Sequence, residues 1–167
     1  MLVTSIRLSK IMLFASSLIV FVVTCRGQTA TTSASAIYAQ QVVSETLAAH
    51  PELVGFEVAG IPPGETQCVT IASSEPKGIG EKCDKDEFGA MRTNKPFVEK
   101  EKENGREVYD VTVPIHDVDG RIIATAGLDF KPEPGQNATQ VRERSQKIAR
   151  EVESKIKSKE MLFQEKH

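Results

Sequence analysis

The sequence contains no tryptophan, only three cysteines and three histidines, and no internal repeat. So few scattered cysteines and histidines exclude a zinc cluster, an iron–sulfur site and a small domain held together by many disulfides. The sequence also lacks Gly-x-Ser-x-Gly, His-Glu-x-x-His and a glycine-rich phosphate loop. These are signatures of common hydrolases, metalloproteases and nucleotide-binding enzymes. We therefore expect no enzymatic activity, no catalytic residue, no metal and no cofactor.

The composition is that of one ordinary globular domain. The chain has 167 residues, of which 40% are apolar and 26% are charged. Its formal charge is −2, and Arg7, Lys10 and Arg26 are the only charged side chains before Gln28, so the remainder carries −5. An acidic chain argues against nucleic acid as the main partner.

The N-terminus has the layout of a secretory signal. Arg7 and Lys10 precede an apolar run over residues 11–23, interrupted only by two serines, and small residues follow. This run is shorter than the roughly 20 residues that span a bilayer. We predict a signal peptide over residues 1–27, cleaved near Gln28, and a periplasmic or secreted protein. Two alternatives remain open: a lipoprotein modified at Cys25, because Val22–Cys25 is similar to a lipobox, and an uncleaved signal anchor.

Hydrophobic spacing predicts the first elements of the domain. After a small-residue linker over 28–35, apolar residues at helical spacing predict a helix over 36–49. Residues 53–61 and 67–73 are expected to be strands separated by the Pro62-Pro63-Gly64 turn. The polar segment 75–105 is expected to be a loop with one short helix around residues 84–91.

A β-hairpin is the clearest expected element. Residues 108–115 and 121–130 alternate in polarity, and Asp119-Gly120 between them suits a tight turn. His116, Asp117 and Asp119 suggest a metal site, but the hairpin already requires the Asp-Gly turn and the calcium-loop spacing is absent. We assign these residues to the turn.

A long helix is expected at the C-terminus. Residues 137 to about 163 contain no glycine or proline and carry a narrow apolar stripe formed by Val141, Ile148, Val152 and Ile156. Residues 141–167 have a net charge of +3, whereas residues 28–140 have −8. A solvated helix of mixed charge is the simplest interpretation, and contact with an acidic partner, a membrane surface or the domain's own core remains an alternative.

This order of elements predicts an α+β fold, in which an antiparallel sheet is flanked by helices. Three segments, Cys68–Gly80, Met91–Phe97 and Tyr109–Asp129, resemble Cache-type sensor domains, the extracytoplasmic relatives of PAS domains. The last segment includes a Val-Pro-Ile step, the Asp-Gly turn and a small-residue strand ending in Gly-Leu-Asp. The resemblance covers roughly residues 34–131 and implies a PAS/Cache-like domain over 36–135, followed by the charged helix over 136–167.

The resemblance implies a small-molecule sensor. Such domains bind amino acids, carboxylates or other small polar metabolites between the sheet and the insertion after the second strand, and they signal through a membrane protein. This sequence ends at His167 without a second span or output module, so we expect a free-standing binding protein with a separate membrane signalling partner. The alternative is a structural or assembly protein that forms a homodimer or binds a partner through its C-terminal helix.

Small polar side chains on the hairpin face opposite the apolar one suggest where a ligand binds: Asp110, Thr112, Thr125 and Asp129. In the insertion, Arg92 and Lys95 suit a ligand carboxylate, whereas a buried Asp129 suits an ammonium group. We add Tyr109 to these candidate ligand-binding residues. The competing interpretations are ordinary surface cations for Arg92 and Lys95, a cap or salt bridge for Asp129, and core packing for Tyr109.

Cys68 and Cys83 form the last candidate pair. Outside the cytoplasm two thiols tend to pair, and a disulfide closing a loop of this length stabilises a fold by about 3 kcal/mol. Two buried thiols too far apart to meet are the alternative. Neither cysteine lies in a Cys-x-x-Cys pattern, which excludes thioredoxin-like and c-type haem sites.

Overall fold

The computed structural model describes residues 37–103 and 105–165. The predicted signal peptide over 1–27, the lipidation candidate Cys25 and the linker over 28–35 lie outside the described residues. Within these two ranges, no helix combines the length and the apolar character needed to cross a membrane.

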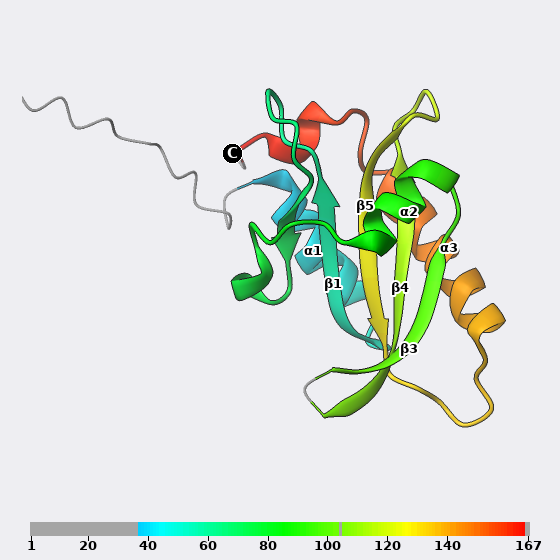
Figure 1. Cartoon of the computed structure of the whole chain (residues 1–167). Helices are drawn as coiled ribbons and strands as arrows, with labels where there is room; N and C mark the ends of the chain where they lie inside the picture. The colour runs from blue at the N-terminus through cyan, green and yellow to red at the C-terminus, as the bar shows by residue number, and fades with distance from the viewer. Residues whose placement is uncertain (1–36, 104, 166–167) are drawn as a thin grey trace, which may run out of the picture. The chain divides into compact units, whose positions relative to one another are not determined.

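One five-stranded sheet organises the domain. Its strands are antiparallel in the order β2-β1-β5-β4-β3, and they are β1 (Leu53–Gly60), β2 (Val69–Ser73), β3 (Phe97–Glu103), β4 (Arg106–His116) and β5 (Ile122–Phe130). The α-helices of the described residues are α1 (Tyr38–Ala49), α2 (Lys85–Thr93) and α3 (Ala138–Glu153). Figure 1 shows α1 and α3 behind the sheet and α2 in front of it. The predicted α+β architecture is confirmed.

The predicted hairpin is β4 and β5. Val111 pairs with Leu128 and Val113 with Ala126, so the apolar residues of both strands share the face covered by α1 and α3. Gly120 in the turn has φ of +76°, a conformation that glycine adopts without steric cost. Asp117 accepts a hydrogen bond from the Arg121 backbone N–H at 3.0 Å, which is a structural role in the turn.

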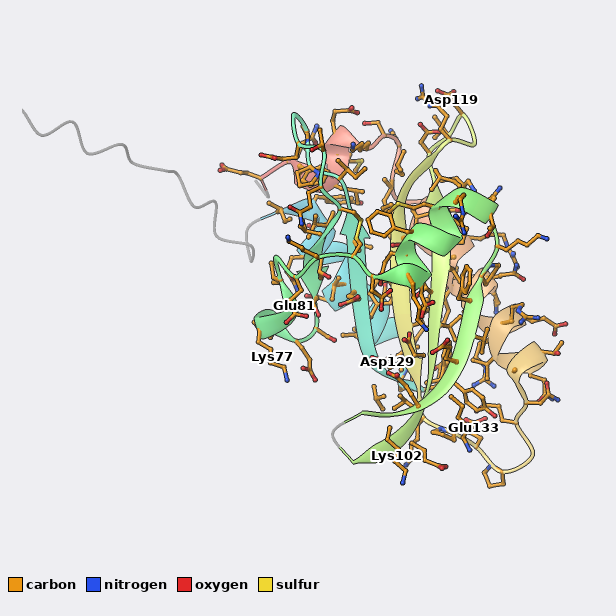
Figure 2. All side chains as sticks on the ribbon, in the orientation of Figure 1. Lys77, Glu81, Lys102, Asp119, Asp129 and Glu133 are labelled. Atoms are coloured by element: carbon orange, nitrogen blue, oxygen red, sulfur yellow. A yellow bond between two sulfur atoms is a disulfide. The ribbon has the colours of Figure 1, made fainter. Side chains whose placement is uncertain are left out.

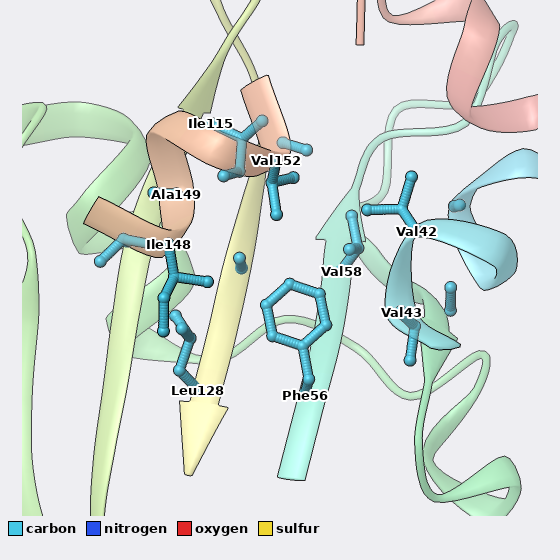
Figure 3. Packing of buried hydrophobic residues seen from close by; sticks show 14 of the residues in the cluster. Val42, Val43, Phe56, Val58, Ile115, Leu128, Ile148, Ala149 and Val152 are labelled. Carbon is cyan, nitrogen blue, oxygen red and sulfur yellow. The ribbon is translucent and has the colours of Figure 1, made fainter. Parts of the chain in front are cut away.

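The hydrophobic core lies between the sheet and the helices α1 and α3. Phe56 and Leu128 from the sheet pack with Ile148 and Val152 from α3 and with Val42 from α1 (Figure 3). The apolar stripe of α3 is buried: the exposed fraction is at most 1% for Val141, Ile148 and Val152. One chain therefore already buries this stripe against its own core. Contact with the domain's own core, one of the alternatives, is correct.

Helix α3 begins as the sequence predicts and ends earlier. The Asn137 side chain accepts the N–H groups of Thr139 and Gln140, which forms an N-cap. The helix ends at Glu153 instead of continuing to residue 163. The Ile156 N–H then bonds the carbonyl of Glu153, three residues back, and this tighter turn places Ile156 in the core with 1% exposure. A short 3-10 helix, η3 (Glu160–Phe163), follows.

Strand β3 lies in the segment that the sequence predicts as a loop. It forms an edge of the sheet and pairs with β4 from Phe97 to Glu103. Its glutamates and lysines alternate, and ion pairs link Lys85 to Glu99 at 3.1 Å and Lys100 to Glu107 at 3.1 Å. Such charges are typical of edge strands, where they oppose pairing with another chain.

A disulfide joins Cys68 to Cys83, with their Cα atoms 5.4 Å apart, so the predicted pairing is confirmed. Backbone hydrogen bonds reinforce it, because the Thr70 N–H donates to the Glu81 carbonyl and the Gly80 N–H to the Thr70 carbonyl. The intervening segment includes a short 3-10 helix, η2 (Pro76–Gly78), and α2 begins two residues after Cys83. We call residues 74–83 the η2 segment. The disulfide fixes both this segment and the start of α2 beside the sheet.

Candidate ligand-binding site

The face of the sheet under α2 carries the predicted polar residues. Asp110 of β4 is paired directly with Asp129 of β5, and Thr112 is paired with Gly127. Thr125 lies on the same face, is fully buried and donates its hydroxyl to the Ala59 carbonyl at 3.4 Å. The hairpin alternation therefore places all four predicted side chains, Asp110, Thr112, Thr125 and Asp129, on one face. Their role in binding stays a prediction.

A carboxylate that the sequence analysis missed joins this face from β1. Glu57 is paired with Gly127, and Asp129 is paired with Gly55, so each of these two acids lies opposite a glycine. A Cβ atom on Gly127 would lie 2.9 Å from Cγ of Glu57, and one on Gly55 would overlap the Asp129 carboxylate. The glycines thus leave room for the two acidic side chains to lie across the neighbouring strand. We call Glu57, Asp110 and Asp129 the sheet carboxylates.

Two of the sheet carboxylates, Glu57 and Asp110, lie in an environment that opposes negative charge. Burial, followed by the nearby charges of Glu87 and Asp110, raises the pKa of Glu57 from 4.5 to about 7. Burial, followed by the charges of Asp129 and Glu101, raises the pKa of Asp110 from 3.8 to about 7. Like charges directly opposite each other on two strands are destabilising. This face therefore favours protons or a bound cation.

A cleft opens beside two of these acids. It has a volume of 310 Å³ and lies between β1, the end of β2 and the η2 segment. We call it the acidic cleft, because carboxylates dominate its charged lining, which consists of Glu57, Glu75, Lys77, Glu81 and Asp129. Figure 2 shows Lys77 and Glu81 on the loop beside the sheet, with Asp129 on the sheet itself. Lys77 forms an ion pair with Glu75 at 3.0 Å.

The acids at the start of α2 have a different role. The Asp84 side chain accepts the Asp86 N–H at 2.7 Å, and Glu87 accepts the Asp84 N–H at 2.7 Å, which together form a capping box. Negative charge is also favourable at a helix N-terminus. These contacts explain Asp84 and Glu87 without a ligand.

The cations expected to bind a ligand carboxylate do not line the acidic cleft. Arg92 and Lys95 are exposed, and Arg92 instead lines a separate hollow along α2 with Phe88 and Met91. The competing interpretation as surface cations fits this placement better.

Tyr109 also lies away from the predicted group. It is paired with Phe130 on the face covered by α1 and α3, and its hydroxyl donates to the Gln136 carbonyl at 3.3 Å. Residues adjacent in a strand point to opposite faces, so Tyr109 and Asp110 cannot share one pocket. Tyr109 therefore packs against the core, which was the competing interpretation for it.

No family model matches the chain, and no curated protein matches its sequence. Among solved structures, a putative GAF sensor protein from Burkholderia vietnamiensis aligns with a TM-score of 0.52 and 14% identity, over 74% of this chain and 76% of that one. The protein has a PAS-like fold. This fold agrees with the PAS/Cache-like class predicted from the sequence.

Two further solved structures are similar at a lower level. The E. coli DcuS sensor domain aligns with a TM-score of 0.42 and 14% identity over 55% of this chain, and the chain spans 65% of that domain, less than two thirds of its length. The inducer-binding domain of the PobR transcription factor from Acinetobacter, in complex with 3-hydroxybenzoic acid, aligns with a TM-score of 0.44 and 15% identity over 71% of this chain and 94% of that one.

Proposed function

We propose that this protein is a small-molecule-binding, sensor-type domain whose acidic cleft binds a ligand through an ammonium group. The single observation that carries the proposal is the placement of Glu57 and Asp129 in a cleft of 310 Å³. This volume lies at the lower end of the range for ligand pockets and suits a small metabolite. An ammonium group donates up to three hydrogen bonds and would offset the negative charge of the cleft.

The unfavourable arrangement of the sheet carboxylates supports a binding role. Glu57 and Asp110 each have a raised pKa, so ionising them in the folded protein costs free energy. Such costs are typical of functional sites, where local stability is given up for ligand recognition. A bound cation would recover that free energy. The site thus favours an amine or an amino acid over a simple carboxylate.

An extracytoplasmic location is part of the same proposal. It is supported by the Cys68–Cys83 disulfide, because disulfides persist mainly in oxidising compartments. The signal-like N-terminal sequence is consistent with it. The description of the Burkholderia vietnamiensis protein as a sensor supports a sensing role. A separate membrane protein would then respond to whether a ligand is bound.

Thermal unfolding of the oxidised protein tests the proposal. The panel contains primary amines, polyamines, amino acids and the matching carboxylates that lack an amino group. A ligand present at 100 times its dissociation constant adds about 2.7 kcal/mol to the stability of the native state. We expect the stabilising compounds to carry an amino group.

Two variants and one control place the binding in the cleft. Asp129→Asn and Glu57→Gln are expected to abolish the ligand-induced shift in melting temperature, whereas Glu143→Gln removes an exposed carboxylate of α3 and keeps it. Arg92→Ala is also expected to keep the shift. The proposal fails if no amine stabilises the protein, or if the shift persists in Asp129→Asn.

A further inference from the structure

Val54 connects the acidic cleft to a second cavity. Its side chain lines the acidic cleft, and it also lines a hollow of 560 Å³ together with Glu107, Val108, Lys131 and Pro132. We call this second cavity the apolar hollow, because three of its five lining residues are apolar. Val54 is one of the few large apolar side chains that the described residues leave exposed, at 53%. The two cavities therefore adjoin at an exposed apolar side chain.

A bulge in β1 explains why Val54 is exposed. Leu53 is paired with Phe130 and Gly55 with Asp129, so β1 has one residue more than β5 at this point, and that residue is Val54. Leu53 and Phe130 both belong to the hydrophobic core. An extra residue in a strand interrupts the alternation and redirects a side chain. Val54 is thereby kept out of the core and lies beside the cleft that contains Asp129.

The apolar hollow continues the face of the sheet that carries the carboxylates. Val108 lies two residues before Asp110 in β4, and residues two apart in a strand share a face. Lys131 follows Asp129 by two residues, and its N–H bonds the Glu52 carbonyl at 3.4 Å, which extends the pairing with β1. Two residues of a strand span roughly 7 Å. A chain of a few methylene groups can therefore reach from the acidic cleft into the apolar hollow.

The two cavities differ in charge. Glu57 and Asp129 bring carboxylates to the acidic cleft. In the apolar hollow, Glu107 is already paired with Lys100 at 3.1 Å, and the exposed Lys131 forms no ion pair with another described residue. A second cation on a ligand would lie near Lys131 and would lose water beside apolar side chains, which costs free energy. The hollow therefore suits an uncharged part of a ligand.

We propose that the ligand of the acidic cleft is a primary amine with an apolar chain. Its ammonium group binds Glu57 and Asp129, and its chain crosses Val54 and enters the apolar hollow. This inference rests on the proposed function, because it requires the cleft to bind an ammonium group. Binding in this way removes both the methylene groups of the ligand and the exposed Val54 from water. The ligand class is thus an apolar monoamine and not a diamine or a polyamine.

Affinities of the oxidised protein for n-alkylamines, from ethylamine to hexylamine, test the inference. Isothermal titration calorimetry measures each dissociation constant under the same conditions. We expect the affinity to rise along the series, by up to about fourfold for each methylene group that leaves water, the factor that corresponds to its transfer free energy. Equal dissociation constants along the series would overturn the inference.

Hexamethylenediamine is the matched probe for charge. It has the same number of carbon atoms as hexylamine and carries a second ammonium group at the far end of the chain. We expect it to bind more weakly than hexylamine, because its second charge would enter the apolar hollow near Lys131. A diamine that binds at least as tightly as hexylamine would refute an uncharged chain in the hollow.

Two valine variants locate the chain. Val54→Ser is expected to reduce the ratio of the affinities for hexylamine and ethylamine. Val118→Ser is the matched control, because Val118 is also exposed, at 74%, lines neither cavity and lies beyond the opposite end of β4 from Val108. It should keep the wild-type ratio. An unchanged ratio in Val54→Ser would place the chain elsewhere and contradict the inference.

Methyl chemical shifts of the wild-type protein cover the case in which Val54→Ser does not fold. Hexylamine should shift the methyl signals of Val54 and Val108 more than ethylamine does. Phe88, an exposed apolar residue of α2, lines a different hollow, and its ring signals should respond equally to both amines. A response to chain length at Phe88 and not at Val54 would assign the chain to α2 and exclude the apolar hollow.

Asp129→Asn separates a failure of this inference from a failure of the proposed function. If all the amines bind equally well and Asp129→Asn abolishes their binding, the cleft binds an ammonium group but the apolar hollow is not used. If no amine binds, or if binding persists in Asp129→Asn, the proposed function is wrong and the inference fails with it.

Discussion

Replacing Glu57 with glutamine should stabilise the protein at neutral and alkaline pH. The pKa of Glu57 is raised from 4.5 to about 7 in the folded state, by burial and by the neighbouring acids. This difference of about 2.5 pKa units corresponds to roughly 3 kcal/mol, because one unit is worth 1.36 kcal/mol. An ionised Glu57 therefore lowers the free energy of unfolding by about this amount.

The pH dependence has a defined sign. Below pH 4.5 the carboxyl is protonated in both folded and unfolded states, so it does not affect the free energy of unfolding. Between pH 4.5 and 7 the unfolded state releases its proton and the folded state keeps it, so the wild-type free energy of unfolding falls as the pH rises. Above pH 7 the penalty is constant. Glu57→Gln removes this penalty. Asp110, whose pKa is also raised, makes the wild-type free energy of unfolding fall further as the pH rises.

Urea unfolding followed by far-UV circular dichroism measures this effect, since the chain has no tryptophan. Wild type and Glu57→Gln should be about equally stable at pH 4, and the variant should be more stable by up to about 3 kcal/mol at pH 8. Glu143→Gln, on the exposed side of α3, should follow the wild-type curve. If Glu57→Gln is less stable than wild type at pH 8, our account of the sheet carboxylates is wrong.

Two further predictions concern the residues that shape the acidic cleft. Gly55→Ala should destabilise the protein by roughly 1–3 kcal/mol, because the added Cβ overlaps the Asp129 carboxylate. Gly60→Ala should destabilise it less, because its Cβ would lie 3.5 Å from the nearest atom. Urea unfolding compares the two variants, and equal losses of stability would count against a close approach at Gly55. Cys68→Ser should lower stability by about 3 kcal/mol, the value expected for a loop of this length, and reduced wild type should unfold like the variant. A variant as stable as the oxidised wild type would show that the disulfide does not stabilise the fold.

The elements predicted best from the sequence are those with an unbroken periodic pattern. The hairpin formed by β4 and β5 has a strict alternation with period 2, which determines both its pairing and the face on which Asp110 and Asp129 lie. The same alternation places Tyr109 on the opposite face, in the core packing that was its competing interpretation. Periodicity within one strand was the more reliable guide.

The features that the sequence did not predict depend on contacts between distant residues. Glu57 lies in an apolar strand, and the space for its side chain comes from Gly127, which is 70 residues away. Strand β3 has the charged composition of a loop because it is an edge. Helix α3 ends at Glu153 because the core buries Ile156. Local propensity carries no information on any of these contacts.

The η2 segment continues directly from the end of β2, and its far end is held by the Cys68–Cys83 disulfide and by the backbone pairing of Gly80 and Glu81 with Thr70. Side chains of this loop can be replaced without changing the residues through which β1 and β2 pair, because that pairing ends at Ser73. It supplies Glu75, Lys77 and Glu81 to the acidic cleft. Ligand preference could therefore diverge, or be redesigned, within about a dozen residues while the rest of the fold stays unchanged.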